Sequence, residues 1–548
     1  SVPEGAWGTA GNWEIDNGGV RETASACPAG DDGAVFESNA NITSLPSNSQ
    51  SVRQITIADG CELTLSHGKT LSVENVGGNG TLVLTGDSNV KARSTESKID
   101  CNVRIDGTAK MTSDSWLNVN GALLGTGVLT LYRGSGYTGV RLCGDNKDFA
   151  GTVVVDSNNN NRMKFAAAAA GSPNAVFQVN GGTDNGSMTF DSGTIQFGEF
   201  KAPNGANIRC TTGPYTYEIG GKGTDFDMGS PNFFTAGKVT VAKTGAGTML
   251  FACYNYGTLE LREGVAQRNS RAANTLPTSK MTFTGGTFAF GTGGADDISE
   301  LIKDASAAIK LDLGTNNVTF ATALAASNAG GLEKSGSGTL TLSAAPLMTG
   351  GGWILAQGAL EVPSGATMET LTISDGAELH ITDSYSTAGT YDLLTFTGTE
   401  PSPETLSRIK LTGIGGNSTC ETPFVEDGKI KAVVSAEALV WDGDNENWTA
   451  SGKWQGKSSG DAKTFAANDV VEFAVPDGVT NTVVVDSAVN PSSVTVTTAG
   501  TGIQRFTGPG GLSAGTFTLD GNTEYAAGTL SLGALELTGG TFTLAGDA

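Results

Sequence analysis

The sequence predicts an all-β protein built as a parallel β-helix, a solenoid in which short strands stack coil on coil. A glycine turn followed by an alternating strand recurs five times, as in KSGSGTLTLS at Lys334–Ser343. Strands also recur at a regular spacing of about 18 to 20 residues. Glycine supplies 78 of the 548 residues and charged residues only 16%, a composition typical of a chain that folds around tight turns rather than of collagen or a disordered region.

The recurring motif has a clear strand character. In the stretch at Lys334–Ser343, Leu340 and Leu342 fall on one face of a strand, and threonines fall on the other. Near copies lie at Gly77–Gly86, Gly125–Gly134, Lys243–Ala252 and Gly511–Gly521. Repetition at this frequency indicates a repeat architecture.

The strand spacing predicts the size of one coil. The strands TLTL, ALEV and ELHI follow one another near residues 340, 360 and 379. A single coil would leave its apolar face exposed, so stacking on neighbouring coils must bury it. At about 20 residues per coil, the chain would form about 27 coils. With neighbouring coils ~4.8 Å apart, these would make a rod of ~130 Å.

One stretch carries a helical signal. In DDISELIKDASAAIKLD at Asp296–Asp312, Ile298, Leu301, Ile302 and Ile309 share a stripe. Asp297 followed by Glu300 has the spacing of a capping box. We therefore expect one short helical insertion near 296–310.

Several stretches carry a resemblance to a known family. KTGAGTM, KSGSGTLTLS, GDNKDFAGTVVVDS and GGLEKSGSGTLTLS after NNVTFATALAASNAG resemble the autotransporter-associated β-strand repeats of bacterial surface proteins. The resemblance touches most of the chain and is carried best by the cluster K-[ST]-G-x-G-T. It implies a right-handed parallel β-helix presented outside the cell, with no shared catalytic residue. The chain departs from the family in showing no run of C-terminal amphipathic strands of about ten residues, as a membrane barrel requires.

A longer repetition sets the domain map. WGTAGNW at Trp7–Trp13 returns as WDGDNENW at Trp441–Trp448, and Phe36 recurs as Phe473. The sequence therefore predicts a β-helical repeat module at 1–438, followed by the Trp-rich head and first coils of a second, similar module at 439–548. The last residues stop within the pattern without a polar cap, so we expect an excerpt of a longer protein or an end that something else covers.

Charge and apolar runs exclude some partners. With 56 acidic and 33 basic residues the net charge is −23, which repels phosphate backbones and anionic bilayers, so we expect no nucleic-acid partner. No apolar run reaches the length of a membrane span, and Ser1 does not begin a signal peptide. The seven cysteines show no CxxC pair, which argues against a zinc site or a disulfide scaffold.

Residues for catalysis are scarce. The two histidines, His67 and His380, lie at a turn and on the outward face of a strand, and a structural role explains both. Asp296 and Asp297 are adjacent acids, but helix capping already explains the second. We therefore expect no enzyme activity, no catalytic residue and no cofactor.

Three acidic residues near the second tryptophan-rich segment are a candidate calcium site. Asp442, Asp444 and Glu446 place carboxylates as a calcium loop does. Asn447 replaces the glycine expected at position six, and Lys453 replaces the distal glutamate at position twelve. An ordinary turn explains the stretch better.

The tryptophans are the remaining candidates for binding. Aromatic rings can stack on sugar rings or can pack over the first coil of a module, and packing is the more frequent use. The candidates for glycan stacking are Trp7, Trp13, Trp441, Trp448 and Trp454.

These observations predict an extracellular structural or adhesive rod, serving as a spacer or fibre subunit on a bacterial cell surface. The expected partners are the protein itself, end to end or through further modules, and surface glycans. The alternatives are a carbohydrate-active β-helix enzyme, which needs a groove with converging carboxylates and a basic residue, and a sugar-binding surface module. The sequence leaves the receptor, the assembly state and the export route open.

Overall fold

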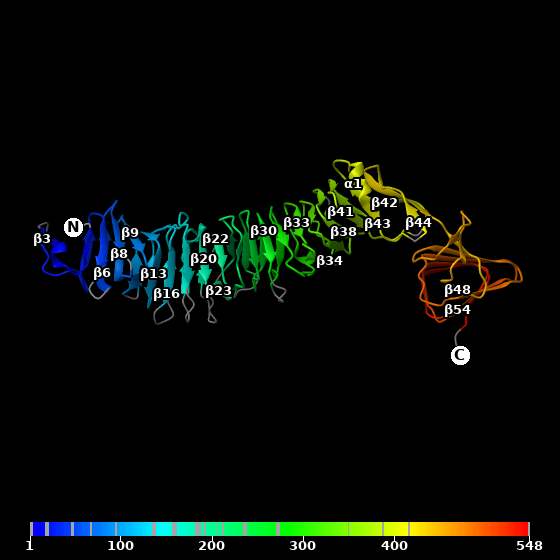
Figure 1. Cartoon of the computed structure of the whole chain (residues 1–548), viewed down its shortest axis with the longest axis horizontal. Helices are drawn as coiled ribbons and strands as arrows, with labels where there is room; N and C mark the ends of the chain where they lie inside the picture. The colour runs from blue at the N-terminus through cyan, green and yellow to red at the C-terminus, as the bar shows by residue number, and fades with distance from the viewer. Residues whose placement is uncertain are drawn as a thin grey trace. The chain divides into compact units, whose positions relative to one another are not determined.

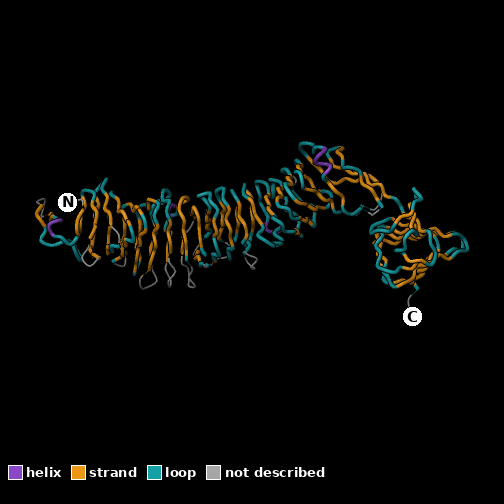
Figure 2. Tube along the Cα trace, viewed as in Figure 1, coloured by secondary structure: helices purple, strands orange, loops and turns teal. Residues whose placement is uncertain are grey.

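The structure is a computed structural model. It divides into two compact units, Ser1–Asn316 and Asn317–Ala548. Strands make up 54% of the chain and helices 3%, and this confirms the all-β class (Figure 2). The structure describes residues 4–16, 21–44, 49–65, 68–93, 96–133, 139–155, 162–180, 188–190, 193–203, 205–210, 213–233, 238–269, 275–348, 350–385, 388–414 and 417–545.

The first unit is a parallel β-solenoid. Its longest ladder joins each strand to the next through parallel pairing, from β4 (Gly33–Phe36) to β31 (Lys280–Phe283) (Figure 1). Because every pair is parallel, each strand belongs to a different coil. The strands between these two are β6 (Ser49–Ile57), β8 (Thr70–Gly77), β10 (Ser88–Ala92), β13 (Thr108–Ser113), β16 (Val128–Arg133), β18 (Thr152–Val155), β20 (Ser172–Val179), β22 (Gly193–Lys201), β24 (Tyr215–Ile219), β27 (Val239–Lys243) and β29 (Thr258–Leu261).

Further parallel ladders complete the coils of this unit. One continues from β8 through β11 (Glu96–Ile99), β14 (Trp116–Val119), β17 (Gly139–Leu142), β19 (Arg162–Phe165), β21 (Met188–Phe190), β23 (Asn207–Cys210) and β26 (Asn232–Phe233). Another comprises β1 (Glu4–Ala6), β5 (Ala40–Ser44), β7 (Glu62–Leu65), β9 (Thr81–Thr85), β12 (Asn102–Asp106) and β15 (Leu123–Gly125). A last one comprises β25 (Phe226–Asp227), β28 (Thr248–Phe251), β30 (Val265–Arg268), β32 (Thr287–Ala289) and β33 (Ile309–Asp312).

The core fills the inside of the coils. Along β18, Val153 and Val155 are buried, while Thr152 and Val154 are partly exposed. Larger rings stack from coil to coil: Phe197 lies 5.5 Å from Phe165 and 4.9 Å from Phe177, measured between ring centroids. Each coil thus covers the apolar side chains of its neighbours, as a solenoid requires.

The second unit begins with the same architecture. β34 (Val318–Phe320), β36 (Thr339–Leu342), β38 (Gly358–Val362), β41 (Ala377–Ile381) and β43 (Ile409–Leu411) form one parallel ladder. β35 (Leu332–Ser335), β37 (Trp353–Leu355) and β40 (Leu371–Ile373) form a second. In β36, Leu340 and Leu342 are buried and the threonines face outward, which confirms the alternation expected from the motif.

The pairing then changes direction. β39 (Ala366–Met368) pairs in parallel with β42 (Gly389–Phe396). β42, β44 (Ser418–Cys420) and β45 (Phe424–Glu426) all pair antiparallel with β46 (Lys429–Ala436).

The last residues form parallel coils again. One ladder contains β47 (Leu439–Trp441), β51 (Val470–Val475), β53 (Ser493–Thr498), β55 (Leu512–Asp520) and β57 (Leu530–Gly539). The other contains β48 (Glu446–Asn447), β52 (Thr480–Val484), β54 (Ile503–Gly508), β56 (Asn522–Ala527) and β58 (Phe542–Leu544). An antiparallel hairpin of β49 (Trp454–Gly456) and β50 (Ala462–Lys463) is attached to β47.

The solenoid has about 21 turns, fewer than the 27 coils expected. Many coils are longer than the assumed repeat, since Val155 pairs with Val179 in the coil above it. The antiparallel strands around β46 also use residues that add no coil.

The short helical insertion predicted near 296–310 is confirmed only as one 3-10 turn. Within Asp296–Asp312 this turn covers Ser299–Leu301, and the last residues form the strand β33. Ile298, Ile302 and Ile309 are fully buried, and β33 pairs with β32, so stacking on the solenoid outweighs the helical preference of the sequence. Among the described residues, the α-helix is α1 (Pro403–Ser407).

Candidate functional site

The lysine of the K-[ST]-G-x-G-T motif is buried. Lys243 is fully inaccessible, and its ammonium group donates to the carbonyl oxygens of Thr244, Gly245 and Glu263 at 2.7, 2.6 and 3.3 Å. Three acceptors match the three N–H groups of an ammonium. Burial lowers the pKa of Lys243 to about 8, against the opposing effect of Glu263 and Asp225, so the side chain remains mostly charged at pH 7.

Lys334 repeats this arrangement in the second unit. It is also fully buried, and its ammonium group donates to the carbonyl oxygens of Gly336, Gly338 and Gln357 at 2.7, 2.5 and 2.7 Å. Gly358 has a φ of +66°, and a Cβ there would lie 2.6 Å from Lys334 Nζ. The glycine loop of the motif therefore wraps around the lysine of the same motif. The lysine also bonds to the next coil, so its role is structural.

The histidines do not assemble a catalytic group in the described residues. His380 lies on the outer face of β41, where Nε2 is 3.0 Å from Glu378 and Nδ1 is 3.8 Å from Glu361. His67 lies outside the described residues. Asp296 forms an ion pair with Arg268, and Asp297 accepts a hydrogen bond from the Ser299 amide at 2.9 Å.

The calcium candidates each have a separate partner. Asp442 accepts from the Gln455 amide group, Asp444 accepts from the backbone of Thr482 at 3.0 Å, and Glu446 lies 3.4 Å from the Lys453 ammonium. Within the described part of the chain, no group of three or more His, Cys, Asp or Glu side chains is placed to hold a metal ion. The structure therefore does not bring these three carboxylates together.

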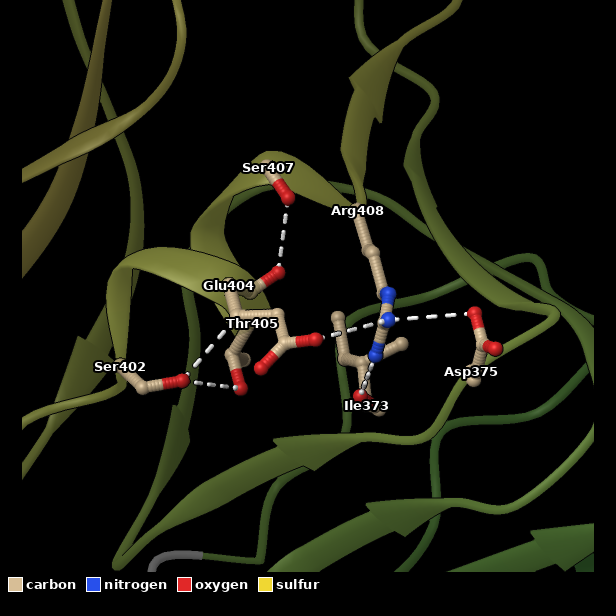
Figure 3. A network of polar contacts seen from close by, with 7 residues as sticks. All are labelled: Ile373, Asp375, Ser402, Glu404, Thr405, Ser407 and Arg408. Atoms are coloured by element: carbon tan, nitrogen blue, oxygen red, sulfur yellow. Dashed lines mark hydrogen bonds and ion pairs between the residues drawn. The ribbon is translucent and has the colours of Figure 1, made fainter.

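A polar network surrounds Arg408, at the end of α1 (Figure 3). Its guanidinium donates to the Ile373 carbonyl at 2.7 Å and to the carboxylates of Asp375 and Glu404 at 3.2 and 3.3 Å. Ser402 caps the helix by accepting from the Thr405 amide at 3.2 Å. Both carboxylates are highly exposed, so the network fixes the short helix to the turn after β40 and does not enclose a reaction site.

Most of the candidate tryptophans are core residues. Trp448 and Trp454 are fully buried, and Trp7 and Trp441 are 2% and 5% exposed. Their ring faces are covered by other side chains, so they present no surface for a sugar. Trp13 is half-buried, and the hypothesis of sugar stacking remains a prediction for this ring.

Trp13 lines a pocket beside β4. The pocket has a volume of about 660 Å³, and its wall includes Trp7, Trp13, Ile15, Val35 and Phe36. The rings of Trp7 and Trp13 lie 4.7 Å apart, and Trp13 lies 5.6 Å from Phe36. The volume is in the range of ligand-binding pockets, and its aromatic wall makes it a candidate for a binding site.

The structure corrects the match between the two tryptophan-rich segments. In the sequence Trp7 was matched with Trp441, but in the structure Trp7 and Trp13 contact each other in the same way as Trp448 and Trp454. The indole N–H of Trp13 donates to the Trp7 carbonyl at 2.9 Å, and that of Trp454 donates to the Trp448 carbonyl at 2.8 Å. The shared spacing of six residues is the signal that finds this match in the sequence.

In comparisons with known proteins, no family model, curated protein or solved structure matched the chain. Among the described residues, no helix has the length and apolar character needed to cross a membrane.

Proposed function

We propose that this chain is an extracellular structural or adhesive protein of a bacterial surface, which acts as a spacer or fibre subunit without catalysis. The observation that carries the proposal is the unbroken parallel ladder from β4 to β31. In such a ladder each coil is tied to the next by backbone hydrogen bonds along the solenoid axis, which suits a stiff support.

Two features support this function. The most repeated motif is used for structure, because Lys243 and Lys334 donate to backbone carbonyls inside the coils. The net charge of −23 suits a well-hydrated surface. The resemblance of the motif to autotransporter-associated repeats supports a place outside the cell.

Small-angle X-ray scattering of the full chain tests the spacer function. We expect a linear cross-section plot, with a cross-section radius that matches a single solenoid. A bell-shaped distance distribution, typical of a globule, would contradict the proposal. If the purified chain steadily released reducing ends from surface polysaccharides, the proposal that it acts without catalysis would be contradicted.

A further inference from the structure

A column of basic side chains follows the outer face of one ladder in the first unit. Lys98 of β11 pairs with Asn118 of β14, which in turn pairs with Arg141 of β17. Arg141 pairs directly with Lys164 of β19. Lys98 is exposed and the other three residues are partly exposed, while the neighbours of each along its strand are buried. Three cations therefore lie on four successive coils, and Lys98, Arg141 and Lys164 are called the basic face below.

The basic face lacks the acidic partners that other basic side chains of this acidic chain have. On a neighbouring ladder, Arg104 forms ion pairs with Glu62 and Asp106. Within the described ranges, neither Lys98 nor Arg141 forms an ion pair with an acidic side chain, although the chain contains 56 acidic residues. The positive charges of these two residues are therefore available to an external anion.

Arg141 is held in place by uncharged partners. Its Cζ atom lies 4.1 Å from the ring centroid of Trp116, and one terminal nitrogen donates to Asn118 Oδ1 at 3.3 Å. Its Nε atom is buried and has no hydrogen-bond partner in the structure described above. Stacking on an indole orients a guanidinium without neutralising it. Arg141 is therefore fixed in direction and keeps its full charge, which suits binding of a carboxylate.

The pairing of Arg141 with Lys164 places like charges on adjoining coils. Paired positions in a ladder are only ~4.8 Å apart, and like charges directly opposite one another reduce stability. An anion bound between the two side chains would offset this repulsion. Local destabilisation of this kind is expected at functional positions.

The ladder restricts the kind of ligand. β14 pairs with β11 on one side and β17 on the other, and β17 pairs with β14 and β19. Because neither strand has an open edge, an extended peptide cannot join the sheet through its main chain. A ligand must instead be bound by the side chains of the outer face. A stiff chain with repeated anionic groups suits such a site, because it loses less conformational entropy on binding.

We propose that the basic face binds a single chain of an acidic polysaccharide of the uronic-acid type, whose carboxylates contact Lys98, Arg141 and Lys164. The sugar chain would lie along the solenoid axis, where the cations recur at multiples of ~4.8 Å. The net charge of −23 repels anionic polymers from the rest of the surface, so binding is confined to this face. The inference goes beyond the spacer function and is independent of it, because the site needs only these four coils.

The probe is a short, fluorescently labelled oligomer of galacturonic acid, added to the full chain at low ionic strength. We expect saturable binding, measured by fluorescence anisotropy. Binding should be lost when the carboxylates of the oligomer are reduced to alcohols, because the cations then have no anion to bind. Added salt should weaken it, because salt screens charges on an exposed surface.

A matched pair of variants locates the site. Arg141→Gln removes a charge from the basic face, and we expect it to weaken binding roughly tenfold. Arg104→Gln removes the same charge from a residue that already has acidic partners, and we expect binding to change by about twofold or less. If Arg141→Gln fails to fold, Lys164→Gln is compared with Lys91→Gln, since Lys91 lies 3.3 Å from Asp114.

The inference would be overturned by a lack of saturable binding, by equal binding of the carboxyl-reduced oligomer, or by equal weakening in the two members of a variant pair. Tighter binding of oligoglutamate or of a DNA oligonucleotide to the same face would assign it to another class of partner and would overturn it as well. These results leave the scattering test of the spacer function unaffected, so the failure of one proposal is distinguishable from the failure of the other.

Discussion

Replacing Lys334 with methionine is expected to lower the free energy of unfolding by on the order of 3 kcal/mol. The ammonium group satisfies three carbonyl oxygens, of Gly336, Gly338 and Gln357. Methionine keeps much of the side-chain volume but donates no hydrogen bond, so these carbonyls lose their charged partner. Because Gln357 lies in the adjoining coil, we expect amide hydrogen exchange to accelerate in the coils that contain β36 and β38.

The matched control is Lys98→Met. Lys98 is exposed on the outer face of β11, and a surface substitution of this kind changes stability by about 0.5 kcal/mol or less. Equal stability of Lys334→Met and the wild-type chain in urea unfolding would show that the buried lysine does not hold the glycine loop together.

Replacing Phe197 with alanine is expected to cost about 3 to 5 kcal/mol. Phe197 is fully buried, and its ring lies within 6.0 Å of the rings of Phe165, Phe177 and Tyr217. Phe197 and these three rings come from four strands, so the resulting cavity would weaken stacking between several coils. Urea unfolding followed by tryptophan fluorescence measures the loss.

Gln196→Ala provides the control on the same strand. Gln196 precedes Phe197 and points outward, where its amide donates to Glu218 at 2.8 Å. We expect a loss of about 1 kcal/mol or less. Comparable losses for the two variants would contradict the assignment of inner and outer faces in β22.

Much of the fold could be predicted because its signal is local and repeated. Alternation at Thr339–Leu342 places the leucines inside and the threonines outside, and the structure confirms it. The helix at Asp296–Asp312 could not be excluded from sequence, because its isoleucines suit a helical stripe as well as a buried coil. Pairing of β33 with β32 decides between them, and this contact joins residues that the local pattern does not connect.

The candidate site could be predicted from the sequence to a smaller extent than the fold. The sequence marks the tryptophans as candidates for sugar stacking, but whether their rings are buried depends on contacts with strands elsewhere in the chain. The wall of the pocket beside Trp13 includes residues of β2 (Glu14–Asp16) and β4, and which strands come together around a pocket is a property of pairing rather than of composition. The buried lysines were equally hidden, because a lysine in a glycine-rich loop is ordinarily expected to be exposed.

Cross-linking between coils tests the parallel stacking most directly. Thr341 of β36 lies opposite Glu361 of β38, and Glu361 lies opposite His380 of β41. Neighbouring coils place paired Cα atoms ~4.8 Å apart, within the range of a disulfide, and positions two coils apart are separated by ~9.6 Å, beyond it. All three side chains lie on the outer face.

The measurement is disulfide formation in two double variants under mild oxidation, mapped by mass spectrometry of the linked peptides. We predict a cross-link in Thr341→Cys with Glu361→Cys and none in Thr341→Cys with His380→Cys. A cross-link in the second variant, or none in the first, would contradict the stacked coils on which the account depends.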